Sequence, residues 1–151
     1  MKRNPVPSLG LSAGLIDTSA ILSIVDANER WHSICLEALQ SVRIPLLTTE
    51  AVLTETFHLT GKNPHHIENA WRFVRSGALT VHPMQDSDLL ELHALMAQYF
   101  DRPMDFADAT LVHLAARERL STILTVDQDD FETYRLPGRK KFTILPLRKR
   151  R

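Results

Sequence analysis

The most informative stretch for predicting the fold is Gly14-Leu15-Ile16-Asp17-Thr18-Ser19-Ala20. Its first four residues form a short apolar run that is typical of a buried β-strand, and residues 19–25 continue with apolar side chains at helical spacing. The same alternation recurs along the whole chain. It predicts further strands at residues 44–48, 79–82, 122–126 and 142–145, and further helices at residues 29–41, 50–61, 65–76, 86–100 and 105–119.

Alternating strands and helices are typical of an α/β protein with a mostly parallel sheet covered on both faces. The chain has 151 residues, enough for one domain with a substantial core, and its 44% hydrophobic and 24% charged residues are ordinary for a globular protein. We expect three parts: an N-terminal extension over residues 1–12, a single domain over residues 13–147 and a basic tail over residues 148–151.

The 18 Lys and Arg residues balance 18 Asp and Glu residues, which excludes a uniformly basic nucleic-acid-coating protein and an acidic disordered chain. Eight of the basic residues and no acid fall within residues 135–151, so residues 1–134 keep 10 basic and 18 acidic residues, a net charge of −8. The basic tail is either a solvated terminus or an arm that holds nucleic acid near an acidic site. Net neutrality therefore leaves nucleic acid open as a substrate.

The single cysteine, Cys35, lies in an apolar helical pattern with Trp31 and Leu39, so we interpret it as a packing residue rather than a catalytic thiol. The chain shows neither a signal-peptide core nor an apolar run long enough to cross a membrane. We therefore expect a soluble, cytoplasmic protein without a membrane partner.

Asp17 and Asp127 end the first and the fourth of the expected strands. In an open α/β sheet, ligands gather outside the carboxyl ends of the strands, so both carboxylates are candidates for a functional site. Each also has a structural explanation, because Asp17 could cap the helix that follows it and Asp127 could be a turn residue. The residues alone leave both interpretations open.

Two glutamates in the helix expected at residues 50–61 differ in their setting. Glu50 lies in the first turn, where a carboxylate interacts favourably with the helix dipole and needs no further role. Glu55 shares a stripe with Val52 and Leu59, so we expect it to face inward. An unpaired buried carboxylate is costly, which means that Glu55 must be neutralised or must find a cation.

Asp105 and Asp108 stand one turn apart at the start of the helix expected at residues 105–119. Asp108 is in register with Leu111, Val112 and Ala115, a spacing that predicts an inward direction. Asp105 could be the N-cap of this helix, with Asp108 as its N3 partner. The capping role and a functional role can coexist.

The alternation of strands and helices could bring five acids to one edge of the sheet: Asp17, Glu55, Asp105, Asp108 and Asp127. Two unit charges ~4 Å apart repel by about 4 kcal/mol at an effective dielectric constant of about 20, so clustered carboxylates need a divalent cation or protonation. Ligation by oxygen alone favours Mg²⁺ or Mn²⁺ over Zn²⁺. Such an ion suits phosphodiester hydrolysis, because it neutralises phosphate charge and orients an attacking water.

Four stretches of this chain resemble, in order, the PIN-domain ribonucleases, and especially the VapC-like toxins of type II toxin–antitoxin modules. They are Ile16-Asp17-Thr18-Ser19-Ala20, Thr49-Glu50-Ala51-Val52-Leu53-Thr54-Glu55-Thr56, Met104-Asp105-Phe106-Ala107-Asp108-Ala109 and Leu124-Thr125-Val126-Asp127-Gln128-Asp129-Asp130-Phe131. The resemblance covers about residues 13–147. It implies a three-layer α/β/α sandwich around a short, mostly parallel sheet, with a Mg²⁺- or Mn²⁺-dependent endoribonuclease site.

The family's four catalytic and metal-binding acids are matched by Asp17, Glu55, Asp108 and Asp127. Asp105 matches a further metal-binding acid that many members carry, and Asp130-Phe131 matches the pair that follows the fourth acid. The resemblance also implies three hydroxyls that orient carboxylates or water, those of Thr18, Ser19 and Thr125. It further implies an RNA substrate, a cognate antitoxin protein and a homodimer.

Other functions fit the residues less well. A phosphotransferase with Asp17 as nucleophile would need a second aspartate two residues later, and a receiver-like phosphoacceptor would need Lys140 or Lys141 in a position that fits poorly. The seven histidines lack the paired spacing of a zinc site, so we expect none of them to be catalytic. The remaining alternative is a PIN-like module that binds RNA or a partner without cleaving RNA.

Overall fold

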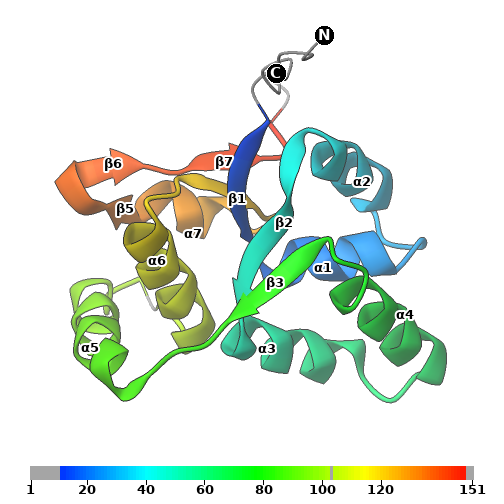
Figure 1. Ribbon diagram of the computed structural model, residues 1–151, viewed down its shortest axis with the longest axis horizontal. Helices are drawn as coiled ribbons and strands as arrows, with labels where there is room; N and C mark the ends of the chain where they lie inside the picture. Colours follow the sequence, from blue (N-terminus) through cyan, green and yellow to red (C-terminus); the bar gives the residue numbers. More distant parts are fainter. Residues whose placement is uncertain (1–10, 103, 149–151) are drawn as a thin grey trace, which may run out of the picture.

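A computed structural model describes residues 11–102 and 104–148 of the protein. Five parallel strands form the central sheet in the order β3-β2-β1-β4-β7 (Figure 1). These strands are β1 (Ser12–Ile16), β2 (Val42–Thr49), β3 (Leu79–His82), β4 (Thr122–Leu124) and β7 (Thr143–Leu145). All five were expected from the apolar runs, and the parallel arrangement follows from the helices that connect them.

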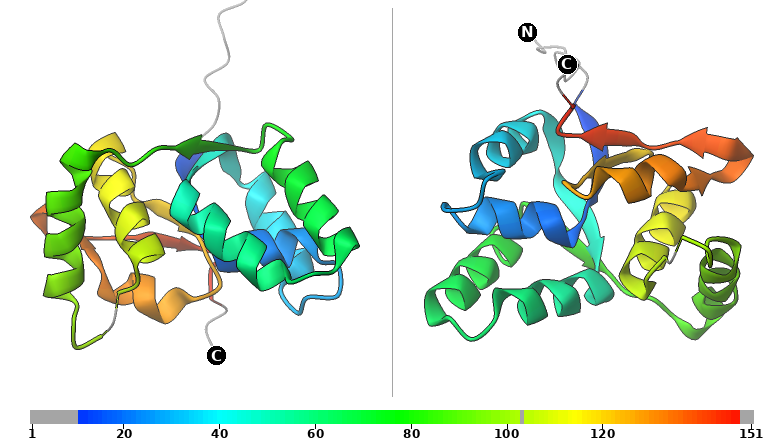
Figure 2. Two further views of the ribbon diagram at one scale, coloured as in Figure 1. Left: turned by 90° about the horizontal axis from the view of Figure 1, so that it is seen from below. Right: turned by 180° about the vertical axis from the view of Figure 1, so that it is seen from behind.

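Helices flank the sheet on both sides. Figure 1 shows α1, α2 and α4 on one side and α5 and α6 on the other, and the views in Figure 2 agree. The helices are α1 (Thr18–Val25), α2 (His32–Gln40), α3 (Glu50–Thr60), α4 (Pro64–Val74), α5 (Leu89–Gln98), α6 (Phe106–Glu118) and α7 (Gln128–Thr133). Two short 3-10 turns, Asp86–Asp88 and Pro137–Arg139, complete the regular structure.

The core lies between the sheet and its helices. Leu15, Ile16 and Ile123 are fully buried, as the short apolar strands predict, and Cys35 is buried among them as a packing residue. At Gly14 the neighbouring strand comes so close that an added Cβ would lie 2.7 Å from the carbonyl oxygen of Thr122. Glycine at this position therefore permits the close pairing of the middle of β1 with the first residue of β4.

The structure differs from the sequence prediction beyond β4. This strand ends at Leu124, so Asp127 lies three residues beyond it and occupies the N-cap position of α7. Two elements beyond β4 were not predicted: α7, which is too short to show a helical period, and a small antiparallel hairpin formed by β5 (Arg135–Leu136) and β6 (Lys140–Lys141). The earlier assignment of Asp127 to the end of a strand was therefore wrong.

The basic tail is described only at its first residue. Arg148 donates to Asp129 Oδ1 over 2.7 Å and to Gln128 Oε1 over 2.9 Å, which attaches the end of the described chain to α7. Residues 149–151 and residues 1–10 of the expected extension lie outside the described residues. None of the helices that the structure describes is both long and apolar enough to cross a membrane.

Candidate active site

Asp17 follows β1 directly and is 3% exposed. It is the N-cap of α1, and its Oδ1 accepts a hydrogen bond from the backbone N–H of Thr18 over 2.7 Å. Its Oδ2 accepts a second bond, from the Thr125 hydroxyl over 3.0 Å. The capping explanation for Asp17 is therefore correct, but a cap does not explain why this carboxylate is buried at the carboxyl end of a central strand.

A chain of hydroxyls joins Asp17 to the end of β4. Because Thr125 gives its single hydrogen to Oδ2 of Asp17, the hydroxyl of Ser19, 3.0 Å away, donates to Thr125. Ser19 Oγ in turn accepts from the backbone N–H of Val126, and Thr125 Oγ1 accepts from that of Asp127. The hydroxyls of Ser19 and Thr125 thus lie beside Asp17. The Thr18 hydroxyl lies 3.4 Å from the carbonyl oxygen of Val52, and its hydrogen bond to Glu55 opposes the rise in the pKa of that carboxyl.

Asp105 and Asp108 begin α6 in the predicted way. Asp105 is the N-cap and accepts from the backbone N–H of Asp108 over 2.8 Å. Asp108 is half-buried, and Leu111 and Ala115 on the same stripe are fully buried, which confirms the expected inward face. Asp108 Oδ2 accepts a hydrogen bond from the hydroxyl of Tyr134 over 2.7 Å.

Glu55 is half-buried on α3, but the stripe predicted around it was wrong. Leu59 is 58% exposed, and the buried face of the helix consists of Val52, Thr56 and Thr60. The two threonines can be buried because each hydroxyl donates to a carbonyl of its own helix, at Val52 and Phe57 respectively. Glu55 consequently lies at the edge of the buried face instead of its centre.

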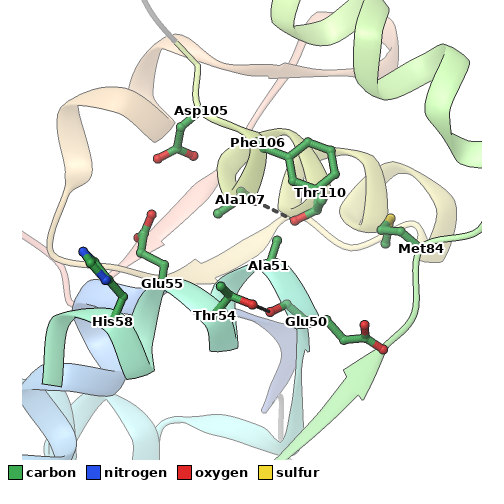
Figure 3. A pocket seen from close by; sticks show the side chains of 10 residues that line it. All are labelled: Glu50, Ala51, Thr54, Glu55, His58, Met84, Asp105, Phe106, Ala107 and Thr110. Atoms are coloured by element: carbon green, nitrogen blue, oxygen red, sulfur yellow. Dashed lines mark hydrogen bonds between the residues drawn. The ribbon is translucent and has the colours of Figure 1, made fainter. Parts of the chain in front are cut away.

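Glu55 and Asp105 face each other across one end of a cleft of about 600 Å³ between α3 and the start of α6 (Figure 3). The rest of the wall is more apolar, and it includes Met84, Phe106 and Ala107. Asp17, Asp108 and Asp127 do not line this cleft. The predicted acids are therefore distributed between the cleft wall and the adjoining strand ends.

Burial is the main cause of raised pKa values in this region. It raises the pKa of Asp17 to about 8, with a further contribution from the negative charge of Asp108. It also raises the pKa of Asp108 to about 7, against the opposing effect of the Tyr134 hydrogen bond. Burial likewise raises the pKa of Glu55, and that of Asp127 with help from the charges of Asp130 and Asp105. The five predicted acids thus interact electrostatically, which is consistent with one shared site.

These carboxylates have no basic partner in the part of the chain that the structure describes. Within residues 11–102 and 104–148, no Lys, Arg or His forms an ion pair with any of the five predicted acids. Nor do any three Asp, Glu, His or Cys side chains of that part of the chain lie close enough together, as they stand, to hold a metal ion. Mg²⁺ commonly binds through one or two carboxylates and keeps several waters, so an all-oxygen donor set of this kind suits it without a closed cage.

Two contacts of this site were missed by the sequence analysis. Tyr134, which binds Asp108, lies 26 residues from it, and no local pattern indicates the contact. Gln128 is buried and donates to the carbonyls of Thr125 and Pro146, which connects the end of β4 to the end of β7. The sequence carries no signal for these residues, because α7 is too short to show a helical period.

The sequence of this chain matches a known protein family and a characterised relative. Residues 14–136 match the family model of the PIN domain. Ribonuclease VapC26 of Mycobacterium tuberculosis is 29% identical over 142 residues, which cover 87% of this chain and 99% of that protein.

Two solved structures have a similar fold. Mycobacterium tuberculosis VapC20, a sarcin-ricin loop cleaving toxin, matches with a TM-score of 0.68 at 18% identity, over 78% of this chain and 92% of that chain. DNA-bound VapBC from Salmonella typhimurium matches with a TM-score of 0.60 at 14% identity, over 89% of this chain and 98% of that chain. These matches confirm the expected α/β/α sandwich around a mostly parallel sheet.

Proposed function

The chain belongs to the PIN-domain family, and from this premise we propose that it is a Mg²⁺- or Mn²⁺-dependent endoribonuclease that hydrolyses RNA phosphodiester bonds. The observation that carries the proposal is a pair of acids, Asp17 directly after β1 and Asp108 in the first turn of α6. Asp17 is buried, Asp108 is half-buried and both have raised pKa values, yet neither has a cationic partner in the described part of the chain. A bound divalent cation would compensate the negative charge that burial disfavours on these two acids and would simultaneously attract a phosphate.

In this proposal Asp17, Glu55, Asp108 and Asp127 would hold the cation, and Asp105 would contribute at the cleft side. When bound, the cation supplies neutralisation of phosphate charge and a correctly oriented attacking water. The protein's own contribution is to fix the carboxylates. The backbone N–H of Thr18 and the hydroxyl of Thr125 each fix one oxygen of Asp17, and the Ser19 hydroxyl orients Thr125.

We further propose that the protein is the toxin of a toxin–antitoxin pair, acts in the cytoplasm as a homodimer and is blocked by a cognate antitoxin. The 29% identity to ribonuclease VapC26 over almost its whole length supports the toxin assignment. The similarity in fold to DNA-bound VapBC is consistent with it. A PIN-like module that binds RNA without cleaving it is the competing outcome of the experiment below.

The test is cleavage of a structured RNA by the purified protein in Mg²⁺ and in EDTA. We expect cleavage only with Mg²⁺, and we expect Asp17→Asn and Asp108→Asn each to reduce the rate more than about 100-fold, beyond the usual cost of losing a residue that only supports a metal ligand. Asp129→Asn is the matched control, because Asp129 lies on α7 but pairs with Arg148. Unchanged cleavage in both site variants would refute the site, and RNA binding without cleavage by the wild type would favour the binding module.

A further inference from the structure

Tyr134 is the buried side chain that contacts the candidate site from the far end of α7. It is 1% exposed, and its hydroxyl donates to Asp108 Oδ2 over 2.7 Å. Aromatic neighbours fix the ring on two sides, since Tyr99 and Phe131 pack edge-on against it with ring centroids 5.1 and 5.2 Å away. The phenol is therefore held in place independently of its bond to Asp108.

The helix that carries Tyr134 also carries another part of the site. Asp127 is the N-cap of α7 and Tyr134 is its C-cap, with the backbone N–H of Tyr134 bonded to the carbonyl of Asp130. The bond from Tyr134 to Asp108 consequently connects α7 to the first turn of α6. It couples the placement of Asp108 to that of Asp127, although the two acids come from different helices.

We propose that Tyr134 is a positioning residue of the active site, whose phenol fixes Oδ2 of Asp108 and leaves Oδ1 available to the divalent cation. The inference rests on the proposed function and extends it to a residue outside the family's acids. A Lys or Arg in this place would also hold Oδ2, but its positive charge would repel the cation. A neutral phenol orients the carboxylate without that repulsion, as the Thr125 hydroxyl does for Asp17.

The chain offers a matched control in Tyr99. Its ring packs against Tyr134, and its hydroxyl accepts one hydrogen bond, from the backbone N–H of Arg135 over 2.9 Å. Tyr134→Phe and Tyr99→Phe therefore each remove one hydroxyl and one hydrogen bond from the same aromatic cluster. Only the first of these bonds involves an acid of the site.

The experiment measures Mn²⁺ binding to the wild type and both variants by electron paramagnetic resonance, alongside the Mg²⁺ dependence of RNA cleavage and thermal unfolding in EDTA. We expect Tyr134→Phe to weaken Mn²⁺ binding about 10-fold, the lower end of the cost of losing an outer partner of a metal ligand. The Mg²⁺ concentration for half-maximal cleavage should rise in parallel. Tyr99→Phe should bind Mn²⁺ like the wild type, even where the two variants unfold at similar temperatures.

Unchanged Mn²⁺ binding in Tyr134→Phe would overturn the inference, and so would equal weakening in both variants, because the effect would then belong to the aromatic cluster. Failure of the proposed function has a different signature. A wild type that binds Mn²⁺ without cleaving RNA would refute the nuclease, yet the binding measurements would still decide the role of Tyr134. A wild type that binds no Mn²⁺ would overturn both.

Discussion

Two sets of aspartates in this protein differ in their partners and in the direction of their pKa shifts. Asp88 and Asp129 are paired with cations, Asp88 with His113 and Arg117, and Asp129 with Arg148. The Gln85 backbone N–H and His113 hold the pKa of Asp88 below its usual value, and Arg148 does the same for Asp129.

The second set is formed by Asp17 and Asp108, which are satisfied by neutral donors and have raised pKa values. The fold thus gives Asp88 and Asp129 cationic partners, whereas Asp17 and Asp108 have none in the part of the chain that the structure describes. Acids that stabilise a fold are normally paired, so unpaired buried acids indicate a place for a ligand.

The largest expected effect is on the pH dependence of stability. In EDTA, the free energy of unfolding should fall as the pH rises from about 4 to about 8, because in this window the folded protein keeps protons on Asp17 and Asp108 that the unfolded chain has lost. The paired aspartates act in the opposite direction and at lower pH. Their stabilisation is present above the ordinary aspartate pKa and is lost as the pH falls below it.

Denaturant unfolding at several pH values, with EDTA and with saturating Mg²⁺, measures this effect. Mg²⁺ should flatten the decline, since a cation bound to the ionised carboxylates of the folded state stabilises it most at high pH. A stability in EDTA that rises steadily from pH 5 to pH 8 would contradict the assignment of Asp17 and Asp108 to an unpaired set.

A smaller effect is expected from one substitution in each set. Asp17→Asn should raise the stability of the metal-free protein at pH 8, because it removes a carboxylate that is destabilised by burial when it is ionised. A shift of one pKa unit corresponds to about 1.4 kcal/mol. An increase of a few kcal/mol is therefore reasonable in EDTA, and it should shrink in Mg²⁺, which the variant binds poorly. Asp129→Asn removes a paired acid and should leave stability unchanged or slightly reduced.

Thermal and denaturant unfolding of the two variants at pH 8 in EDTA provides the measurement. The comparison also separates stability from activity, because the stabilised variant, Asp17→Asn, is the one expected to lose cleavage. If both substitutions destabilised the protein equally, Asp17 would be an ordinary helix cap and the difference between the two sets would disappear.

How well each part of the site could be predicted depended on how far apart in the sequence the interacting residues are. Asp105 and Asp108 were placed correctly because an N-cap and its N3 residue are defined within one turn. The inward face of α3 was misassigned because threonines that satisfy their own hydroxyls replaced the expected apolar residue, so that Leu59 is exposed. The mostly parallel sheet needed no such detail, since the alternation of strands and helices already favours it.

Contacts between distant elements were beyond the reach of the sequence. The hydrogen bond from Tyr134 to Asp108 joins a helix of six residues to the first turn of another helix. No sequence pattern in either helix predicts this contact. The pairing of Arg148 with Asp129 is similar, because the charge count identified a basic tail but not the helix to which its first residue binds. Side-chain partners of this kind depend on the packed arrangement of helices and not on any local period.

The smallest expected effect concerns Arg148 and the paired set. Its guanidinium contacts Asp129 Oδ1 at 2.7 Å and Glu132 Oε1 at 3.6 Å, but all three side chains are at least half exposed. Exposed ion pairs of this kind stabilise little, so Arg148→Gln should lower the midpoint of thermal unfolding by no more than about 2 °C. High salt should reduce this effect to the contribution of the hydrogen bond to Gln128.

The same variant tests whether Arg148 contributes to RNA binding. Because Asp129 and Glu132 already neutralise its charge, Arg148→Gln should keep most of the RNA affinity and of its salt dependence. Deletion of residues 148–151 should weaken binding more and flatten the salt dependence, if the tail holds RNA near the acidic site. Fluorescence anisotropy over a series of salt concentrations compares the two. An equal loss in both proteins would mean that Arg148 leaves its acidic partners to contact phosphate, and the paired set would then include a residue of the RNA-binding surface.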